Sequence, residues 1–525
     1  MDAIQKAIST TSNVLNEFDS LRPHEIYMLV RGRIETSGLS KAAQAAQHWT
    51  IQVVWRTPIH GALRAAGNMQ PYQRRIYLQY RCDMPEYEQL KAGSSAALAD
   101  SGLSMATETV SAVEVESDGE VKSSNESDQV VTPFEVSGGS SGRIDYSKVV
   151  RDFGCSLVDQ QLVERIERLT GCTAHRLLRR HVFFAHRDLH RILDAFEHSG
   201  PRSFYLYTGR GPSSEALHIG HLIPFLFTKW LQDAFGVPLV IQLTDDEKFL
   251  WKNMSISEAS RLARENAKDI IALGFDPKNT FIFRDTEYMG GSFYQNCIEF
   301  ARHVTFSHAR NTFGFSNDSN IGQIGFPPVQ AAPSFPDSFP HLFGSQRKRY
   351  RCLIPCAIDQ DPYFRLTRDV CGKMKGHKPA LIESSFFPGL QGEGTKMSAS
   401  EANNAVYVTD TAKQIKTKIN RYAFSGGQDT AEEQRKYGAK DVEADVSIKW
   451  LTFLMEDDEE LARMKEQYRS GEMLTGQVKE RLIGLLQEFV QEHQRRKSEM
   501  TDEYIDSFFD VAEKQSDQLF GRRDE

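Results

Sequence analysis

The sequence has no long apolar run and few cysteines. No segment approaches the roughly 18 consecutive apolar residues that a membrane-spanning helix needs. The first twenty residues carry Asp2, Glu17 and Asp19 where a secretory signal has its apolar core. Seven cysteines in 525 residues are too sparse for a disulfide scaffold, and the nearest pair, Cys352 and Cys356, has no second pair or histidine at zinc-ligand spacing. We therefore expect a cytoplasmic protein with free thiols, no membrane partner and no protein-bound metal.

Basic residues are also in slight deficit. The 63 Lys and Arg against 71 Asp and Glu give a formal net charge of −8, which excludes a protein that coats nucleic acid non-specifically, so any RNA contact must be local. Most of the acidity lies in residues 101–143, which hold eight acidic residues, two basic residues and ten serines. Such a segment buries too little apolar surface to offset its ordering entropy, so we expect 88–143 to be a disordered linker.

The linker separates an N-terminal appendage, residues 1–87, from the main body. The appendage has no catalytic spacing, and its fold is not predicted. Arginines such as Arg31, Arg33 and Arg56 offer cationic contacts for RNA or an acidic partner. The appendage is therefore either an interaction or RNA-binding module or an extension without a partner, and it is expected to be dispensable for chemistry together with the linker.

Residues 144–400 show the pattern of an α/β domain. A strand pattern at 204–208 is followed by a glycine-rich turn, a helical pattern from about 214 and a second strand pattern at 238–244. This order is the βαβ unit of a parallel sheet, and further strand patterns at 280–283 and 353–357 extend it to a doubly wound, Rossmann-type domain. Residues 401–525 predict a separate all-α domain, with amphipathic helices at about 411–423, 445–455, 475–496 and 501–514.

Two loops carry the strongest chemical signal. The first follows the 204–208 strand and ends in His218-Ile219-Gly220-His221. Its glycines let the backbone approach a phosphate, the helix N-terminus adds N–H donors, and the two imidazoles can donate to phosphate oxygens. The second loop, Gly392-Glu393-Gly394-Thr395-Lys396-Met397-Ser398-Ala399-Ser400, carries Lys396, a compact cation suited to charge that develops on a leaving pyrophosphate. Each motif alone is weak, but together and in this order they predict a nucleotide site.

These loops are the HIGH and KMSKS-type signatures of class I aminoacyl-tRNA synthetases, and the sequence resembles their tryptophanyl branch of the eukaryotic cytoplasmic type. The resemblance runs from about residue 144 into the C-terminal region and includes 206–221, 225–251, 330–335, 353–365 and 395–400. One departure is Ala399, which stands where the KMSKS pattern has its last lysine, a variant found in this branch. Lys396 must then carry the charge of the loop alone.

The resemblance implies a tryptophan pocket. Tyr207 and Gln242 would pair with the indole N–H, which also rejects phenylalanine because its ring offers no donor. The other pocket residues that it implies are Glu247, Gln330 and Gln360 around the ammonium group and Phe364 as an apolar wall.

The resemblance also implies a nucleotide site that takes ATP, with Mg²⁺, as a substrate. The tryptophan carboxylate attacks the α-phosphate and displaces pyrophosphate, so no general base is needed, and the tryptophanyl group then passes to tRNA. The residues that it implies here are His218, His221, Lys396 and Ser398 for catalysis, and Arg210, Gly220, Gln360 and Met397 for nucleotide binding.

The implied partners are tRNA(Trp), bound through the helical domain, and a second copy of the chain in a homodimer. The cations that would face RNA phosphates, rather than merely solvate a helix face, are Lys413, Lys416, Lys418 and Arg421. Two alternatives stay open. One is a tyrosyl-tRNA synthetase, which shares the fold and both loops, and the other is a small-molecule nucleotidyltransferase of the same superfamily, which would lack the helical half.

Overall fold

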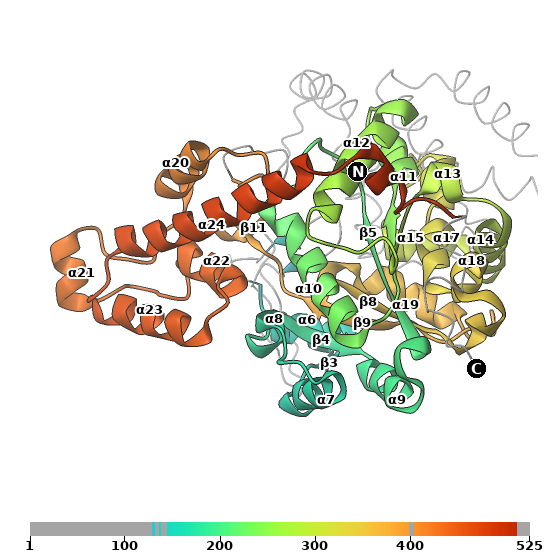
Figure 1. Cartoon of the computed structure of the whole chain (residues 1–525), viewed down its shortest axis with the longest axis horizontal. Helices are drawn as coiled ribbons and strands as arrows, with labels where there is room; N and C mark the ends of the chain where they lie inside the picture. Colours follow the sequence, from blue (N-terminus) through green and yellow to red (C-terminus); the bar gives the residue numbers. More distant parts are fainter. Residues whose placement is uncertain (1–128, 132–135, 138–143, 398–403, 512–525) are drawn as a thin grey trace, which may run out of the picture. The chain divides into compact units, whose positions relative to one another are not determined.

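The structure is a computed structural model, and it describes residues 129–131, 136–137, 144–397 and 404–511 (Figure 1). The predicted appendage, most of the predicted linker, Ser398 and Ala399 lie outside the described residues. Residues 123–525 form one compact unit. None of the helices in the described part is both long enough and apolar enough to cross a membrane.

A seven-stranded sheet forms the centre of this unit. Five of its strands are parallel, and two antiparallel strands, β3 and β4, extend one edge. In spatial order the strands are β3 (Ser156–Leu157), β4 (Phe183–Arg187), β9 (Ala380–Ser384), β8 (Arg351–Ala357), β5 (Phe204–Arg210), β6 (Leu239–Leu243) and β7 (Thr280–Arg284). Among the five parallel strands, chain order runs outward from β5 on both sides, which confirms the doubly wound prediction. The order in which the chain adds strands to the sheet reverses between β5 and β8. α/β sheets bind ligands at such a topological switch point.

Helices cover both faces of the sheet because side chains alternate along each strand. Phe204 and Leu206 of β5 belong to a core cluster with apolar residues of α10, whereas Tyr205 and Tyr207 belong to a second cluster with Phe293 of α14. The helices of this region are α6 (Tyr146–Phe153), α7 (Gln160–Thr170), α8 (Arg176–Arg179), α9 (Leu189–Ser199), α10 (Ile219–Phe235), α11 (Asp245–Trp251), α12 (Ile256–Ile271), α13 (Asp285–Tyr288), α14 (Gly291–His303), α15 (Phe306–Phe313), α16 (Ile321–Gly325), α17 (Pro327–Ala331), α18 (Pro340–Phe343) and α19 (Asp361–Val370).

Helices make up the chain after the short hairpin of β10 (Pro388–Gly389) and β11 (Gly392–Lys396), with no further named strand in the described part. They are α20 (Ala412–Tyr422), α21 (Ala431–Tyr437), α22 (Val446–Leu454), α23 (Asp458–Ser470), α24 (Thr475–Ser498) and α25 (Asp502–Asp506). The helix expected at 501–514 is therefore much shorter than predicted. Trp450 of α22 is fully buried and donates its indole N–H to the carbonyl of Pro388 at 3.0 Å, which joins these helices to the α/β region.

Candidate active site

The first signature loop ends at the N-terminus of α10, which begins at Ile219 rather than at about 214 as expected. His218 is the N-cap residue, and its Nδ1 accepts from the backbone N–H of His221 at 3.3 Å. The neutral ring therefore carries its proton on Nε2, which is the nitrogen able to donate to a phosphate. The His218 and His221 rings stack with their centroids 3.3 Å apart. A Cβ on Gly220 would lie 3.3 Å from both the His218 ring and Phe387, so glycine lets the cap residue pack over the first turn.

Buried side chains of α12 hold this loop in place. Asn266 donates from Nδ2 to the carbonyl of Ser214 at 2.7 Å, and Asp269 accepts the N–H of Leu217 at 3.2 Å. Both α12 residues are fully buried. Asp269 in turn receives Lys497 of α24 at 2.6 Å. The Asp269 carboxylate thus binds both the loop and Lys497 of α24. Figure 1 shows α24 reaching α12.

Tyr207 and Gln242 meet at the carboxyl ends of β5 and β6, as the sequence predicted for residues of one pocket. The Tyr207 hydroxyl donates to Gln242 Oε1 at 2.6 Å. Both N–H donors of the Gln242 amide point away from Tyr207, one to Asp285 Oδ1 at 2.8 Å and one to the carbonyl of Val329 at 3.3 Å. The oxygen of the amide is thereby fixed toward Tyr207. Burial raises the pKa of Tyr207 well above its ordinary value, so its hydroxyl stays neutral.

The remaining predicted pocket residues surround this pair. Gln330, on α17, offers its carbonyl to the Tyr207 hydroxyl at 3.2 Å and its side-chain amide to Gln360 Oε1 at 3.5 Å. Phe364 is buried and stands edge-on to the Tyr207 ring, with the centroids 6.0 Å apart. The structure therefore brings Tyr207, Gln242, Gln330, Gln360 and Phe364 together at the switch point.

Glu247 lies beside the glycine loop and is itself paired. Its carboxylate accepts from Thr244 Oγ1 at 2.7 Å and from Lys248 Nζ at 2.7 Å. A Cβ on Gly211 would collide with the end of the Lys248 side chain and lie 2.8 Å from Glu247 Oε2, so any larger residue there would have to displace this ion pair. Sequence reasoning missed Lys248, although a lysine directly after a predicted site glutamate was a usable signal.

Arg210 is a predicted site residue whose guanidinium has few hydrogen-bond partners among the described residues. Its Nε reaches Asn266 Oδ1 only at 3.5 Å, and its Nη2 is buried without a hydrogen-bond partner among the residues that the structure describes. Burial lowers the pKa of Arg210 to about 10, which the charge of Glu247 partly offsets. Burial and the neighbouring cations Lys248 and Arg210 also lower the pKa of Lys252. The mouth of the glycine loop is thus positively charged, and an anionic group placed there would satisfy the orphaned guanidinium.

The second signature loop is described only in part. Lys396 ends β11 and pairs with Pro388 across the hairpin, and Ser398 lies outside the described residues. Met397, predicted to contact the nucleotide, is 5% exposed and belongs to the same core cluster as the α10 residues. The chain after the loop returns to the first loop, where Ile219 N–H donates to the carbonyl of Val406 at 3.0 Å.

The predicted basic face of α20 has three exposed members. Lys413, Lys416 and Arg421 are exposed to solvent. Lys418 is instead turned inward, because its ammonium donates to Asp410 at 2.7 Å and to the carbonyl of Ala405 at 2.9 Å. Lys418 therefore fixes the segment behind the first loop, and its expected contact with RNA is not supported by this geometry.

Three kinds of comparison agree on what the chain is similar to. The family model for class I tRNA synthetases (W and Y) matches residues 200–491. The cytoplasmic tryptophan–tRNA ligase of Arabidopsis thaliana is 60% identical over 385 residues, which are 73% of this chain and 95% of the relative. The human cytoplasmic tryptophan–tRNA ligase is 56% identical over 380 residues, which are 72% of this chain and 80% of the relative. The crystal structure of the Plasmodium falciparum tryptophanyl-tRNA synthetase aligns with a TM-score of 0.67 at 46% identity and covers 72% of this chain and 99% of its own.

Proposed function

The chain belongs to the class I tRNA synthetases that act with tryptophan and tyrosine, and we propose how its residues carry out the tryptophan–tRNA ligase reaction. The function is the ATP-dependent attachment of tryptophan to tRNA(Trp), and the relatives that share it are named cytoplasmic. The reaction has two steps, in which tryptophan and ATP give tryptophanyl-adenylate and pyrophosphate, and the tryptophanyl group then passes to the tRNA.

The observation that carries the specificity is the buried chain from Tyr207 through Gln242 to Asp285. Because Asp285 and Val329 take both amide N–H groups, Gln242 can only accept at Oε1. The Tyr207 hydroxyl donates its one proton to that oxygen and keeps its own lone pairs for an incoming donor. An indole N–H fills this position, while phenylalanine would leave a buried acceptor unpaired. Phe364 and the ring of Tyr207 supply the apolar walls.

The ends of the amino acid face charged and amide groups. Glu247, Gln330 and Gln360 surround the ammonium group, and Lys248 neutralises Glu247 until the ammonium arrives. The tryptophan carboxylate then lies toward the glycine loop, where it can attack the α-phosphate in line.

Nucleotide binding uses the positive mouth of the loop. The Arg210 guanidinium takes a phosphate or the tryptophan carboxylate, His218 donates from Nε2, and His221 lies beside it on the first turn of α10. Lys396, with Met397 and Ser398, closes over the leaving pyrophosphate, and Gly220 leaves the helix terminus open to the nucleotide. Mg²⁺ would enter with the phosphates of ATP and neutralise part of their charge.

The tRNA is held by the helical region, where Lys413, Lys416 and Arg421 are exposed. We retain the homodimer and the separate domain 401–525 as proposals. On α14, Tyr294 and Ile298 lie one turn apart and are 53% and 52% exposed, as expected of a surface covered by a second copy. A mass near that of the 59.5 kDa monomer in light scattering would contradict the dimer.

Amino-acid-dependent pyrophosphate exchange across all twenty amino acids tests the function. Tryptophan should support exchange, and tyrosine should not. Tyr207→Phe should lower kcat/KM for tryptophan by about 10–100-fold, because one buried hydrogen bond is lost. Tyr205→Phe is the matched control, since its hydroxyl donates to Pro333 away from the pocket. Exchange with tyrosine exceeding that with tryptophan would overturn the assignment.

A further inference from the structure

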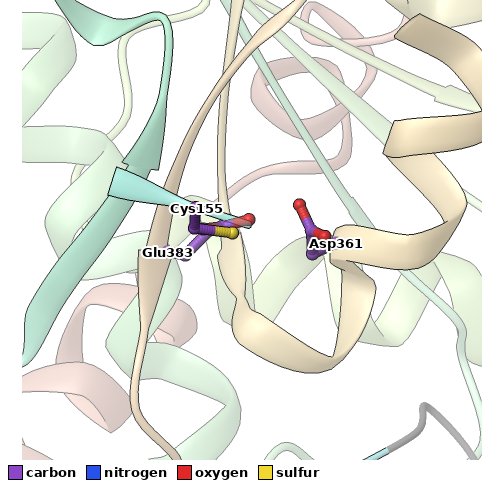
Figure 2. Close-up of side chains that lie close together, drawn as sticks. All are labelled: Cys155, Asp361 and Glu383. Carbon is purple, nitrogen blue, oxygen red and sulfur yellow. The ribbon is translucent and has the colours of Figure 1, made fainter. Parts of the chain in front are cut away.

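Three titratable side chains converge at the antiparallel edge of the sheet. None of the three residues is assigned to tryptophan or ATP binding. Figure 2 shows Cys155, which precedes β3, Glu383 of β9 and Asp361 at the start of α19. One potential ligand atom from each of the three side chains lies within 4.8 Å of the others. These residues come from distant parts of the chain, so their spacing in the sequence gave no sign of the cluster.

Glu383 has no compensating donor. It is fully buried, and neither of its carboxyl oxygens has a hydrogen-bond partner among the described residues. The groups nearest to it are the Cys155 thiol, a weak donor, and the Asp361 carboxyl, which can pair with it only when one of the two acids holds a proton. Burial and the charge of Asp361 raise the pKa of Glu383 well above its ordinary value. A buried carboxyl in this position needs either a proton or a cation.

Arg187 cannot supply that cation, because it is already committed. Its guanidinium binds both oxygens of Asp361, one of them at 2.8 Å, and also donates to the carbonyls of Phe153 at 2.6 Å and Gly154 at 3.2 Å. Four of its five N–H groups are therefore used. Arg187 therefore balances Asp361, and it acts on Glu383 and the thiol only through its charge, without a hydrogen bond to either among the described residues.

We infer that Cys155, Asp361 and Glu383 bind a divalent, thiolate-accepting metal ion of the zinc type. Mg²⁺ and Ca²⁺ prefer oxygen ligands alone, whereas Zn²⁺ accepts one thiolate beside carboxylates. Around a tetrahedral zinc ion, bonds of about 2.0–2.3 Å place ligand atoms roughly 3.3–3.8 Å apart, so atoms within 4.8 Å of one another need to close by no more than about 1.5 Å on binding. Cys356 is in register with Glu383 on the adjacent parallel strand, which places a second buried thiol on the same face as a candidate fourth ligand.

The exchange of metal for protons conserves charge in the buried cluster. Before binding, the Asp361 carboxylate balances Arg187, and Glu383 and Cys155 are neutral. Binding of one M²⁺ releases the carboxyl proton of Glu383 and the thiol proton of Cys155, so two positive charges enter and two leave. The ion would join β3, β9 and the start of α19, and this role does not depend on the proposed synthetase reaction.

Metal binding to the full chain tests the inference without an activity readout. Protein stripped with a chelator and desalted should bind one equivalent of Zn²⁺ in calorimetry, with about two protons released when buffers of different ionisation enthalpy are compared. Co²⁺ should give a thiolate charge-transfer absorption band. Cys155→Ser and Glu383→Gln should weaken Zn²⁺ binding by at least about 10–100-fold. Cys172→Ser, which removes an exposed thiol elsewhere, should bind as wild type does.

Two outcomes would overturn the inference. Wild-type protein that binds no stoichiometric Zn²⁺ and gives no cobalt–thiolate band would mean that Glu383 is a neutral acid sharing a proton with Asp361. Folded Cys155→Ser and Glu383→Gln variants with wild-type affinity would place the bound metal elsewhere. If either variant fails to fold, the cobalt band of the wild type and its retention in Cys172→Ser still decide the question.

Discussion

Arg210 is half-buried, and its buried Nη2 has no hydrogen-bond partner in the part of the chain that the structure describes. Replacing it with an apolar side chain should therefore leave the melting temperature unchanged or raise it, because an unsatisfied buried charge is removed. The same change should raise KM for ATP about tenfold or more, since a charge-assisted hydrogen bond is worth roughly 1.5–3 kcal/mol. Thermal melts and exchange kinetics of Arg210→Met check both effects. Arg264→Met, which removes an arginine paired with Asp502 and Asp506, should leave KM for ATP unchanged.

Asp246 and Asp285 make the pocket sensitive to pH. Burial raises the pKa of Asp246 to about 6 and that of Asp285 well above its ordinary value, and the charge of Asp246 adds to the shift of Asp285. The folded chain thus holds protons that the unfolded chain has lost above pH 3.8. This stabilisation is complete below about that pH and is lost as the pH rises through 6. The side-chain amide of Asp246→Asn does not ionise, so this variant keeps the stabilisation that wild type loses. The melting temperature of the variant minus that of wild type should therefore increase between pH 4 and 7.

The exposed Asp318 supplies the control for this pH dependence. Asp318→Asn should follow the wild-type melting temperature at every pH. A constant difference between Asp246→Asn and wild type across the range would show that the pair is ionised in the folded protein, contrary to the expectation.

The sequence identified most of the site at the level of residues, and it did so through the two loops and the runs that resemble the synthetases. It could not find Asp285, Asn266 or Asp269, because their roles depend on contacts made through space, whereas Lys248, which directly follows Glu247, could have been found. Asp285 follows β7 and reaches Gln242 only when β6 and β7 lie side by side. The inward turn of Lys418 likewise depends on Asp410 and Ala405, which no helical periodicity reveals.

At the scale of elements, the parallel strands β5, β6, β7 and β8 were predictable because each is an apolar run between turn signals. The strands β4 and β9 were missed. β9 carries the acidic residue Glu383 in a fully buried strand, and β4 carries His186 and Arg187, so neither strand has the pattern of a simple apolar run. The helical pattern at 214–218 was also misleading, since Asn266 and Asp269 hold that segment as a loop.

The contact between α24 and α12 carries a prediction about catalysis. Lys497 pairs with the fully buried Asp269, whose other oxygen holds the N–H of Leu217 in the first signature loop. Lys497→Met should lower stability by about 1–3 kcal/mol and reduce kcat for exchange more than it weakens tryptophan binding, because the loop loses its support. Arg495→Met is the control on the same helix, where the arginine pairs with Glu492 and Glu499 of its own helix and C-cap. Equal kcat in the two variants would contradict a link between α24 and the loop.

At the scale of the whole molecule, the question is where the part needed for chemistry begins. The sequence placed the boundary at residue 143, with 1–143 dispensable for tryptophan activation. The structure describes a short hairpin inside that segment, in which β1 (Val130–Val131) pairs with β2 (Val136–Ser137). Gln129 exchanges two hydrogen bonds with the backbone of Asp145, at 2.8 and 3.1 Å, and Val131 packs on a core cluster that includes Ile358. β2 also contacts β11, the strand that ends at Lys396.

Two truncated chains separate the appendage from this hairpin. A chain of residues 129–525 keeps every one of these contacts, so its pyrophosphate exchange should stay within about twofold of the full chain. A chain of residues 144–525 loses the support of β11 and should show a several-fold lower kcat, while tryptophan binding changes less because the Tyr207 pocket lies on other strands. If the appendage contacts RNA, removing residues 1–128 should weaken tRNA binding and flatten its dependence on salt, which a titration at several salt concentrations measures. Loss of exchange in a folded 129–525 chain would mean that the appendage belongs to the catalytic core, and full exchange in the 144–525 chain would mean that β11 does not need the hairpin.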